Sequence, residues 1–281
     1  MELIRHGTRA PYVDILGNHF FPDWATQELT PNGFRQHYIL GNELRLRYPE
    51  IFDHLFTPDE LHVRSTGYNR TLESADAHLN GIFSSFNSWN ITFDSDRKEV
   101  LPPLEDFKFD YASITTKNPL IQNYFPYPIH TTSKNKDYFL KPETTCPEIK
   151  TIEEPKMYEF QNIAESKPYS KKRFNEIYDK YNVHMEDIDK EHPTVLDFFK
   201  LADDILSDKQ NNPKSVFNPD NNDDKDLERD IRDADRASTI FLSSFYSDKK
   251  FNRMAVTPIL EVVTDNFSAM VKDEATKMKY Y

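Results

Sequence analysis

The sequence lacks several features that define large classes of proteins. Its 281 residues contain no apolar run close to the roughly 20 residues that cross a bilayer, so no membrane-spanning helix is expected. Charged residues interrupt the first apolar residues, so no signal-peptide pattern is seen. A single cysteine, Cys146, excludes an internal disulfide. Spacings of the C-x-x-C or H-E-x-x-H type are absent, so neither a metal nor another cofactor is expected.

Positive charge is also scarce. The chain has 35 Lys and Arg against 47 Asp and Glu, which gives a net charge of −12. An acidic protein repels phosphate backbones and anionic membrane surfaces, so no nucleic-acid partner is expected. Any anionic ligand would have to be held by a local cluster of basic residues.

Glycine is rare and unevenly distributed, because all six glycines lie in the first 81 residues. This distribution predicts an α/β module at the start, followed by a part built from helices and loops. A hydrophobic content of 37%, with 14% aromatic residues, is sufficient for a globular core. The length allows one or two domains.

Start and stop signals in the first part of the chain predict alternating strands and helices. Leu3-Ile4 is typical of the end of a short strand, and Thr30-Pro31 of the start of a helix. Residues 61–64 alternate apolar and polar side chains, as a strand does, and Ser65 or Thr66 would cap a second helix. This order predicts an α/β fold with a mostly parallel sheet flanked by helices.

Helical periodicity predicts which side chains face the core. The residues expected to point inward are Phe34, Tyr38, Gly41, Leu44 or Arg45, and Tyr48, then Tyr68, Leu72, Ala75, Leu79 and Ile82, then Phe174, Ile177, Tyr178 and Tyr181, then Leu196, Phe199, Ala202 and Leu206, and then Leu227 and Ile231. Gly41 should allow close packing against the sheet. A last helix is expected to begin at Thr257-Pro258, with Leu260, Val263, Phe267 and Met270 inward, before a strand over 276–281.

The opening stretch LIRHGTRAP gathers charged residues at the predicted end of a strand. It is either a solvated tail or a binding site, because ligands of parallel sheets bind beyond the carboxyl ends of the strands. Arginine offers phosphate a planar fork of donors, and neutral imidazole is a competent nucleophile. Arg5, Arg9 and Arg64 would bind a phosphate group, aided by backbone N–H groups at Gly7, while His6 attacks phosphorus.

LIRHGTRAP matches the Arg-His-Gly-x-Arg-x-Pro signature of the histidine acid phosphatases of the prostatic and lysosomal type, in the histidine phosphatase superfamily. LTPNGFRQHYILGNELRLRY resembles the family's first long helix, and HVRSTGYNRTLESADAHLNGIF its second strand and helix. The resemblance implies a two-domain phosphatase, with an α/β core formed by residues 1–83 and 251–281 and an inserted helix-rich domain over 84–250.

The resemblance also implies an activity, namely metal-independent hydrolysis of a phosphate monoester through a phosphohistidine. His6 would be the nucleophile, and Arg5, Gly7, Arg9 and Arg64 would bind the phosphate. Arg70 is expected to be a helix-surface charge or to support other residues. A secreted or lysosome-like location is implied and a dimer is allowed, whereas the substrate and the pH optimum stay open.

The family's second motif, a His-Asp pair that binds phosphate and protonates the leaving oxygen, has no counterpart. No histidine follows His192, and no His-Asp dipeptide occurs. We therefore expect a fragment of an acid phosphatase that lacks its general acid. The alternatives are a catalytically inactive phosphate-binding pseudoenzyme and a phosphoryl-transferring relative similar to a mutase.

Overall fold

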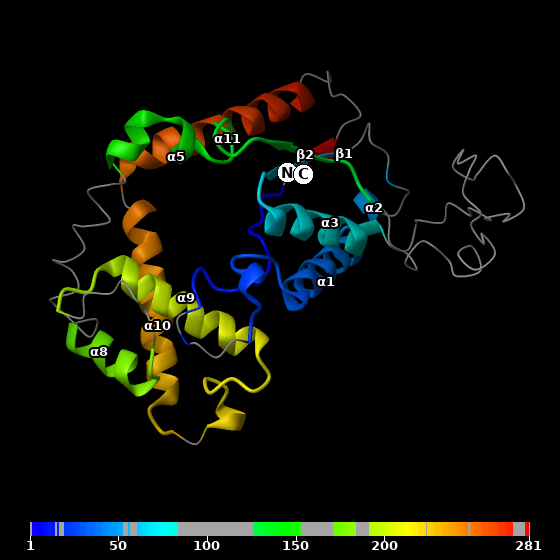
Figure 1. The fold of residues 1–281 in the computed structure, drawn as a ribbon. Coiled ribbons are helices and arrows are strands. Elements are labelled where there is room, and N and C mark those ends of the chain that lie inside the picture. The colour runs from blue at the N-terminus through cyan, green and yellow to red at the C-terminus, as the bar shows by residue number, and fades with distance from the viewer. Residues whose placement is uncertain are drawn as a thin grey trace, which may run out of the picture.

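The computed structural model describes residues 2–14, 16, 20–52, 56, 61–83, 126–152, 171–183, 191–222, 224–246, 248–271 and 279–280. Its elements, in chain order, are η1 (Asp23–Ala25), α1 (Pro31–Arg47), α2 (Pro49–Phe52), β1 (Leu61–Thr66), α3 (Asn69–Phe83), β2 (Ile129–Thr132), α5 (Pro142–Thr145), α8 (Lys171–Lys180), α9 (Val195–Asn211), η3 (Pro219–Asn221), α10 (Leu227–Tyr246), α11 (Lys249–Val271) and β3 (Lys279–Tyr280). Figure 1 shows α1 and α3 beside the strands, and α8, α9 and α10 gathered in a second group.

The strands form a small parallel sheet in the order β2-β1-β3. Val63 of β1 lies opposite Ile129 of β2, and Leu61 lies opposite Lys279 of β3. Burial alternates along β1, with Leu61 and Val63 turned into the core. The sequence expectation of an α/β fold with a parallel sheet and flanking helices is confirmed. Of the final strand expected over 276–281, only Lys279–Tyr280 lies within the described residues.

The expected first strand is absent. Residues 2–8 make no ladder with any described strand, and the backbone N–H groups of Gly7 and Thr8 donate instead to the side chains of Ser74 and Gln36. The segment continues instead into an isolated antiparallel bridge between Arg9 and Leu29. Arg5 and His6 therefore lie on an irregular segment, where side chains of this segment, α3 and α9 can reach them.

Helices α1 and α3 approach closely because each has a glycine where they cross. A Cβ atom on Gly41 would lie 2.1 Å from the carbonyl oxygen of His78, and one on Gly81 would lie 2.1 Å from that of Tyr38. Both distances are far below van der Waals contact, so neither position accepts a larger residue without moving a helix. Gly41 thus serves helix packing, and the expectation that it packs against the sheet is wrong.

Because of the same crossing, the buried face of α1 differs from the one that the sequence predicts. Its buried residues are Gly33, His37 and Gly41. Phe34, Tyr38 and Tyr48, which the helical spacing predicts to point inward, are 37%, 40% and 46% exposed. The two helices meet along a narrow small-residue face, so the larger aromatic side chains are turned outward. In α3 the prediction holds better, since Leu79 and Ile82 are buried.

The second group of helices has its own apolar core. Phe174, Ile177 and Tyr178 of α8 are buried as predicted, as are Leu227 and Ile231 of α10. In α9 the buried face is shifted from the predicted one, and its members are Phe198, Leu201, Ala202 and Ile205. Because α9 is apolar on two sides, periodicity alone does not distinguish the face toward the core from the face toward a cavity.

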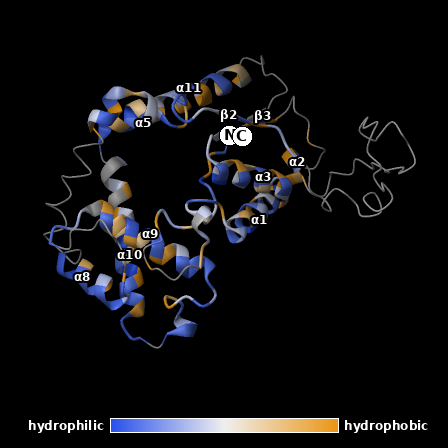
Figure 2. Cartoon of the chain, in the orientation of Figure 1, coloured by the Kyte–Doolittle hydropathy of each residue, from blue (hydrophilic) through white to orange (hydrophobic). Residues whose placement is uncertain are grey.

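Helix α11 differs most from its prediction. It begins at Lys249 and contains Pro258 in its interior, instead of beginning at that proline. Leu260 and Phe267, expected inward, are 56% and 63% exposed. Figure 2 shows hydrophobic and hydrophilic residues mixed around this helix. No helix among the described residues is both long enough and apolar enough to cross a membrane.

Candidate active site

His6 lies between the sheet, α3 and the second helical group, and its ring has a defined tautomer. Nδ1 is 2.8 Å from the carbonyl oxygen of Gly7. A carbonyl can only accept a hydrogen bond, so the proton must be on Nδ1. Nε2 then keeps its lone pair and is available to attack an electrophile.

The surroundings of His6 favour its neutral form. Burial, together with the positive charges of Arg5, Arg70 and Arg9, lowers the pKa of His6 to about 4 against the opposing hydrogen bond to Gly7. A cationic ring would be poorly solvated here and would face three guanidinium groups. His6 is therefore an uncharged imidazole over most of the acidic and neutral range.

Gly7 is held where only a glycine fits. A Cβ atom on Gly7 would lie 2.4 Å from the carbonyl oxygen of Gly33, at the start of α1. Its backbone N–H donates to Oγ of Ser74 at 3.0 Å, and that hydroxyl donates to the carbonyl of Arg70 at 2.6 Å. The turn that carries His6 is thus fixed to α1 and to the first turns of α3.

Arg9 is engaged by a carboxylate from the second helical group. Its Nη1 and Nη2 donate to the two oxygens of Asp203 on α9, at 2.9 and 2.7 Å. The Arg9 side chain is 9% exposed and that of Asp203 is 13% exposed. This fork-to-fork geometry is the one that arginine offers to phosphate, so Asp203 occupies the position that an anion would take.

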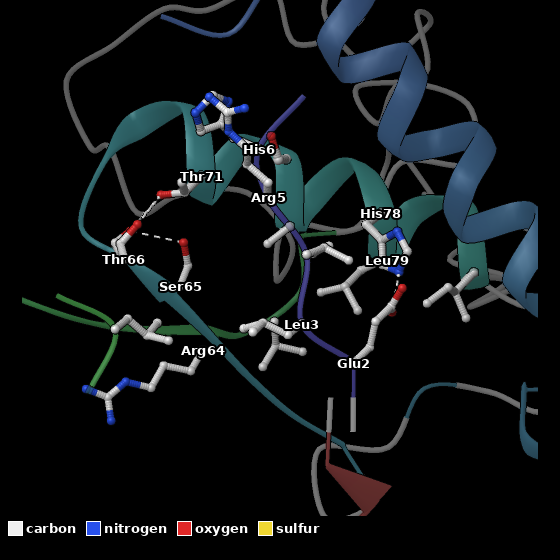
Figure 3. A pocket seen from close by; sticks show the side chains of 16 residues that line it. Glu2, Leu3, Arg5, His6, Arg64, Ser65, Thr66, Thr71, His78 and Leu79 are labelled. Carbon is white, nitrogen blue, oxygen red and sulfur yellow. Dashed lines mark hydrogen bonds and ion pairs between the residues drawn. The ribbon is translucent and has the colours of Figure 1, made fainter. Parts of the chain in front are cut away.

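Arg64 forms an ion pair with a different carboxylate, that of Asp137. Its Nη2 donates to Oδ1 of the buried Asp137 at 2.8 Å, and its guanidinium lies 4.8 Å from the ring centre of Phe139. Figure 3 shows the Arg64 side chain extending away from His6. Its charge is therefore matched by a carboxylate on the side of β1 away from the imidazole.

Arg5 and Arg70 provide the positive charge nearest His6 that is not neutralised. The guanidinium of Arg5 is exposed and has no hydrogen-bond partner or counter-ion among the described residues. Arg70 is partly buried, and its guanidinium lies 4.5 Å from the ring centre of Tyr68. Burial and the charge of Arg9 lower the pKa of Arg70, which marks it as a desolvated cation beside another cation.

From the sequence, Arg70 is expected to be a helix-surface charge or to support other residues, so its effect on His6 was missed. One signal was available, because Arg70 and Ser74 are four residues apart and therefore share one face of α3. Ser74 contacts Gly7, so that face is turned toward the turn that carries His6. This face could be identified only once the hydrogen bond between Gly7 and Ser74 was known.

Two cavities adjoin His6, and both Arg5 and His6 line each of them. The first, of about 270 Å³ and drawn in Figure 3, includes Arg64 and is walled by apolar side chains such as Leu3, Leu79 and Ile82. The second, of about 290 Å³, includes Gly7, Arg9 and residues of α9 and α10. Arg9 and Arg64 thus line different cavities. Among the described residues, no group of three His, Cys, Asp or Glu side chains is arranged to hold a metal ion.

The sequence of this chain matches a known class of protein. A family model for the histidine phosphatase superfamily, branch 2, matches residues 1–217, and the chain belongs to that family. Within it, the chain is similar to acid phosphatases. It is 33% identical to lysosomal acid phosphatase of Xenopus laevis over 155 residues, which cover 53% of this chain and 29% of that protein. It is 27% identical to prostatic acid phosphatase of Mus musculus over 172 residues, covering 59% and 38%.

Solved structures share the fold at low sequence identity. The apo form of Hafnia alvei phytase matches with a TM-score of 0.57 and 15% identity, over 98% of this chain and 69% of that one. The phytase from Citrobacter braakii matches with a TM-score of 0.54 and 14% identity, over 93% and 64%. The matched part of this chain spans about a third of the length of the acid phosphatases, 29% for the Xenopus laevis protein.

Proposed function

We propose that this chain carries the phosphate-binding and nucleophilic half of an acid phosphatase, which hydrolyses phosphate monoesters through a phosphohistidine at His6. One observation supports the proposal above the others. His6 is neutral, donates from Nδ1 and keeps the Nε2 lone pair, and three arginines act on it electrostatically. Phosphate ester chemistry needs such a nucleophile beside fixed positive charge.

The proposed reaction has two steps. Nε2 attacks phosphorus, and the bond from phosphorus to the ester oxygen breaks with its electron pair on that oxygen, so that the leaving group departs as an anion and takes a proton from water. Water then attacks the phosphohistidine and releases inorganic phosphate and neutral His6. In the cavity beside α9, the described residues offer Asp203 as a carboxyl group, but both of its oxygens already accept hydrogen bonds from Arg9. The first step is therefore expected to depend on a leaving group that departs without a proton.

We further propose that Arg5 and Arg70 are the principal phosphate ligands, with Arg9 joining them once Asp203 is displaced. Arg64 stays a prediction from the sequence, since its partner is Asp137. The same holds for Gly7, whose N–H already donates to Ser74. Because the matched relatives are named lysosomal acid phosphatases, we propose a lysosomal or secreted location.

The inserted domain also stays a proposal. The helical group of α8, α9 and α10 packs around its own core, as a separate domain would. Strand β2, however, lies within the range 84–250 and pairs with β1. If the helical group is an insertion, the boundary would fall after residue 132.

The test is covalent labelling. The chain is incubated with 4-nitrophenyl phosphate and with an alkyl phosphate, quenched, and assayed for acid-labile phosphohistidine. We expect label and residual turnover with the aryl ester, and a rate for the alkyl ester lower by about 10²–10⁴-fold, because a positioned general acid contributes that much. His6→Ala should abolish both signals. Binding of phosphate without any His6-dependent label would favour a non-catalytic phosphate-binding protein.

The arginine assignment is tested separately. Arg70→Ala should weaken binding of inorganic phosphate by roughly tenfold or more, as expected for the loss of a hydrogen bond between charged groups. Arg64→Ala is the matched comparison, because it removes the same group from the other side of β1. A larger loss in Arg64→Ala than in Arg70→Ala would restore the sequence-based assignment.

A further inference from the structure

Two buried histidines lie beside the segment that carries His6. His37 of α1 and His78 of α3 are each 4% exposed, and their ring centres are 6.1 Å apart in an edge-to-face arrangement. They belong to the crossing of the two helices, where a Cβ atom on Gly41 would lie 2.1 Å from the carbonyl oxygen of His78. The helices therefore leave this histidine pair little room to move.

Both rings of the histidine pair contact the N-terminal segment. Nε2 of His78 lies 3.1 Å from Oε2 of Glu2, as Figure 3 shows, and a carboxylate can only accept, so His78 donates from Nε2. The backbone carbonyl groups of Arg5 and His6 act as hydrogen-bond acceptors for His37. His37 donates from Nε2 as well, because its Nδ1 has no partner among the described residues. The histidine pair thus holds the segment by one side chain and by its main chain.

The two Nδ1 atoms of the histidine pair are left over. Both are buried, and neither has a hydrogen-bond partner in the part of the chain that the structure describes. With the proton on Nε2, each Nδ1 of a neutral ring is an acceptor, and a buried acceptor without a donor is costly. One added proton removes the unpaired lone pair from one ring and places a cation beside the carboxylate of Glu2.

Several charged groups respond to such a cation. Burial, and after it the charge of His78, lowers the pKa of His37, whereas the two backbone carbonyl groups and the carboxylate of Glu2 raise it. The cavity drawn in Figure 3 is lined by the titratable groups of three elements, namely Glu2, Arg5 and His6 of the N-terminal segment, Arg64 of β1 and His78 of α3. Because the two rings interact, the first proton belongs to the pair and a second one is disfavoured.

We propose that His37 and His78 form a pH-sensitive pair that positions the main chain of Arg5 and His6 for anion binding, and that one proton taken up by the pair in mild acid tightens its hold. The inference rests on the proposed function, because it places the anion at Arg5 and His6. A cationic imidazole donates a stronger hydrogen bond than a neutral one, both to a carbonyl group and to the carboxylate of Glu2. His37 is therefore a positioning residue, since it contacts the backbone of His6 and not the anion.

Proton uptake and anion binding should then favour each other. The lowered pKa of His37 means that the unfolded chain takes up the proton more readily, so the proton costs stability for the fold as a whole. Within the folded chain, the proton strengthens the contacts that hold the anion-binding segment in place. By reciprocity, an anion that requires this segment in place raises the proton affinity of the pair.

The experiment measures the affinity of the full chain for inorganic sulfate by calorimetry at about pH 7 and about pH 5, on the two sides of the ordinary pKa of histidine. Sulfate keeps its double negative charge over this range, so the change in affinity comes from titration of the protein alone. We expect the affinity to rise by about fivefold or more on acidification. In NMR titrations, the ring C–H signals of His37 and His78 should shift over the same pH range, as expected for a coupled pair.

Two variants of His37 separate its hydrogen bond from its charge. His37→Gln keeps an N–H donor near the position of Nε2 but takes up no proton, so it should retain the affinity at neutral pH and lose most of the rise in acid. Any rise that remains belongs to His6, which also binds protons in acid. His37→Leu loses the donor too and should weaken sulfate binding at both pH values by roughly threefold to tenfold.

The partner and a matched control complete the set. Glu2→Gln removes the anion that stabilises the cationic pair, so it should also lose most of the rise. His62→Gln is the control, because His62 is likewise stacked on a histidine, His130, and burial lowers its pKa as well. This change should leave both the affinity and its rise unaltered. Melting temperatures within a few degrees of the unchanged chain establish that the variants are folded.

The outcomes separate the two proposals. If sulfate binds and its affinity rises equally in His37→Gln and in the unchanged chain, the role of the histidine pair is wrong and the proposed function stands. A loss of the rise in His62→Gln as large as that in His37→Gln also contradicts this role. If sulfate binds at neither pH, both proposals fail.

Discussion

Because Nδ1 of His6 donates to the carbonyl of Gly7, a single backbone contact decides that Nε2 is the nitrogen that we propose attacks phosphorus. The same ring is kept neutral by burial and by neighbouring arginines. The tautomer of His6 and its neutral state therefore have different physical causes. The first is local to the turn, and the second depends on residues from α3 and from the N-terminal segment.

The first prediction concerns the titration of His6. The pKa of His6, measured by NMR of its labelled ring, should be about 4. Arg5→Ala removes a positive neighbour and should therefore raise that pKa toward the usual value near 6.5, moving the acid limit of phosphohistidine formation to higher pH. Arg47→Ala, which removes an exposed arginine paired with Glu43, is the control. A pKa near 6.5 in the unchanged chain would contradict the assignment.

The second prediction concerns the carboxylate that occupies Arg9. Asp203→Asn should raise the affinity for inorganic phosphate by roughly tenfold, because the competing anion is removed from a buried guanidinium. The neighbouring Asp204, which accepts from the backbone N–H of Leu16, provides the matched control as Asp204→Asn. Isothermal calorimetry measures both. Weaker phosphate binding in Asp203→Asn would mean that Asp203 orients Arg9 for the ligand instead of competing with it.

Among the elements, α1 and α3 depend on their two glycines. Gly41→Ala and Gly81→Ala each place a methyl group 2.1 Å from a backbone oxygen of the other helix. Backbone cannot move aside as a side chain can, so each change should lower the free energy of unfolding by about 1–3 kcal/mol or more. Urea unfolding measures the loss. Gly67→Ala, whose Cβ would lie 3.1 Å from the nearest atom, should cost less, and an equal cost would contradict this account.

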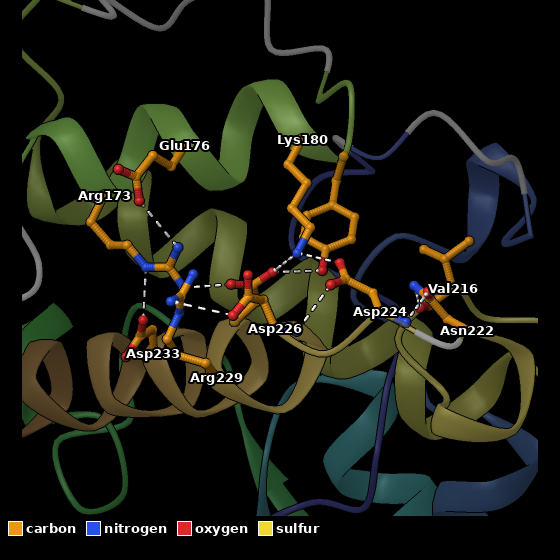
Figure 4. Close-up of polar contacts among 11 residues, drawn as sticks. Arg173, Glu176, Lys180, Val216, Asn222, Asp224, Asp226, Arg229 and Asp233 are labelled. Carbon is orange, nitrogen blue, oxygen red and sulfur yellow. Dashed lines mark hydrogen bonds and ion pairs between the residues drawn. The ribbon is translucent and has the colours of Figure 1, made fainter.

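The second group of helices depends on a charge network around Asp230. Arg173 and Lys180 of α8, which Figure 4 labels, and Tyr181 donate hydrogen bonds to this carboxylate of α10. The Asp230 side chain is 1% exposed, and its hydrogen bonds to Lys180 and Arg173 hold its pKa below the usual range against the effect of burial. A buried carboxylate with three donors fixes the register of α8 on α10.

The fourth prediction follows from that network. Asp230→Asn should destabilise the helical group by about 3–5 kcal/mol, because two cations lose their buried partner. Glu228→Gln, on the same helix, removes an exposed i,i+4 pair with Arg232 and should cost less than about 0.5 kcal/mol. Chemical denaturation followed by circular dichroism compares the two. Similar losses in both variants would show that Asp230 contributes little beyond a surface ion pair.

For the whole molecule, several partly buried histidines link stability to pH. Burial lowers the pKa of His6, His37 and His62, so the unfolded chain binds more protons than the folded one below the usual value of 6.5. Stability should therefore fall as the pH falls through 6.5, down to about 4 for His6. The raised pKa of Glu73 acts in the opposite sense.

The fifth prediction is a lower melting temperature at pH 5 than at pH 7. The double change His6→Asn and His37→Asn should reduce the difference, since two of the groups that gain protons on unfolding are gone. Differential scanning calorimetry over this range measures it. An unchanged difference in the double variant would assign the pH dependence to other groups.

The sequence by itself determined features that depend on short-range patterns. The alternation of Leu61 and Val63 predicted β1, and the helical spacing of Phe174, Ile177 and Tyr178 predicted the buried face of α8. The cluster Arg5, His6 and Gly7 was recognised because these residues are adjacent in the chain. Such patterns show which side chains of a single strand or helix face the core. The residues of that element alone are sufficient to reveal them.

Tertiary structure alone decided which arginines near the N-terminal segment have a carboxylate partner. Arg64 pairs with Asp137, 73 residues further along the chain, and Arg9 pairs with Asp203, 194 residues away. The charge of Arg70 lowers the pKa of His6, because Ser74, one turn further along α3, holds that helix against the Gly7 turn. The charge of an arginine is the same in every sequence context, whereas its counter-ion depends on which distant element packs beside it, and no local pattern carries that information.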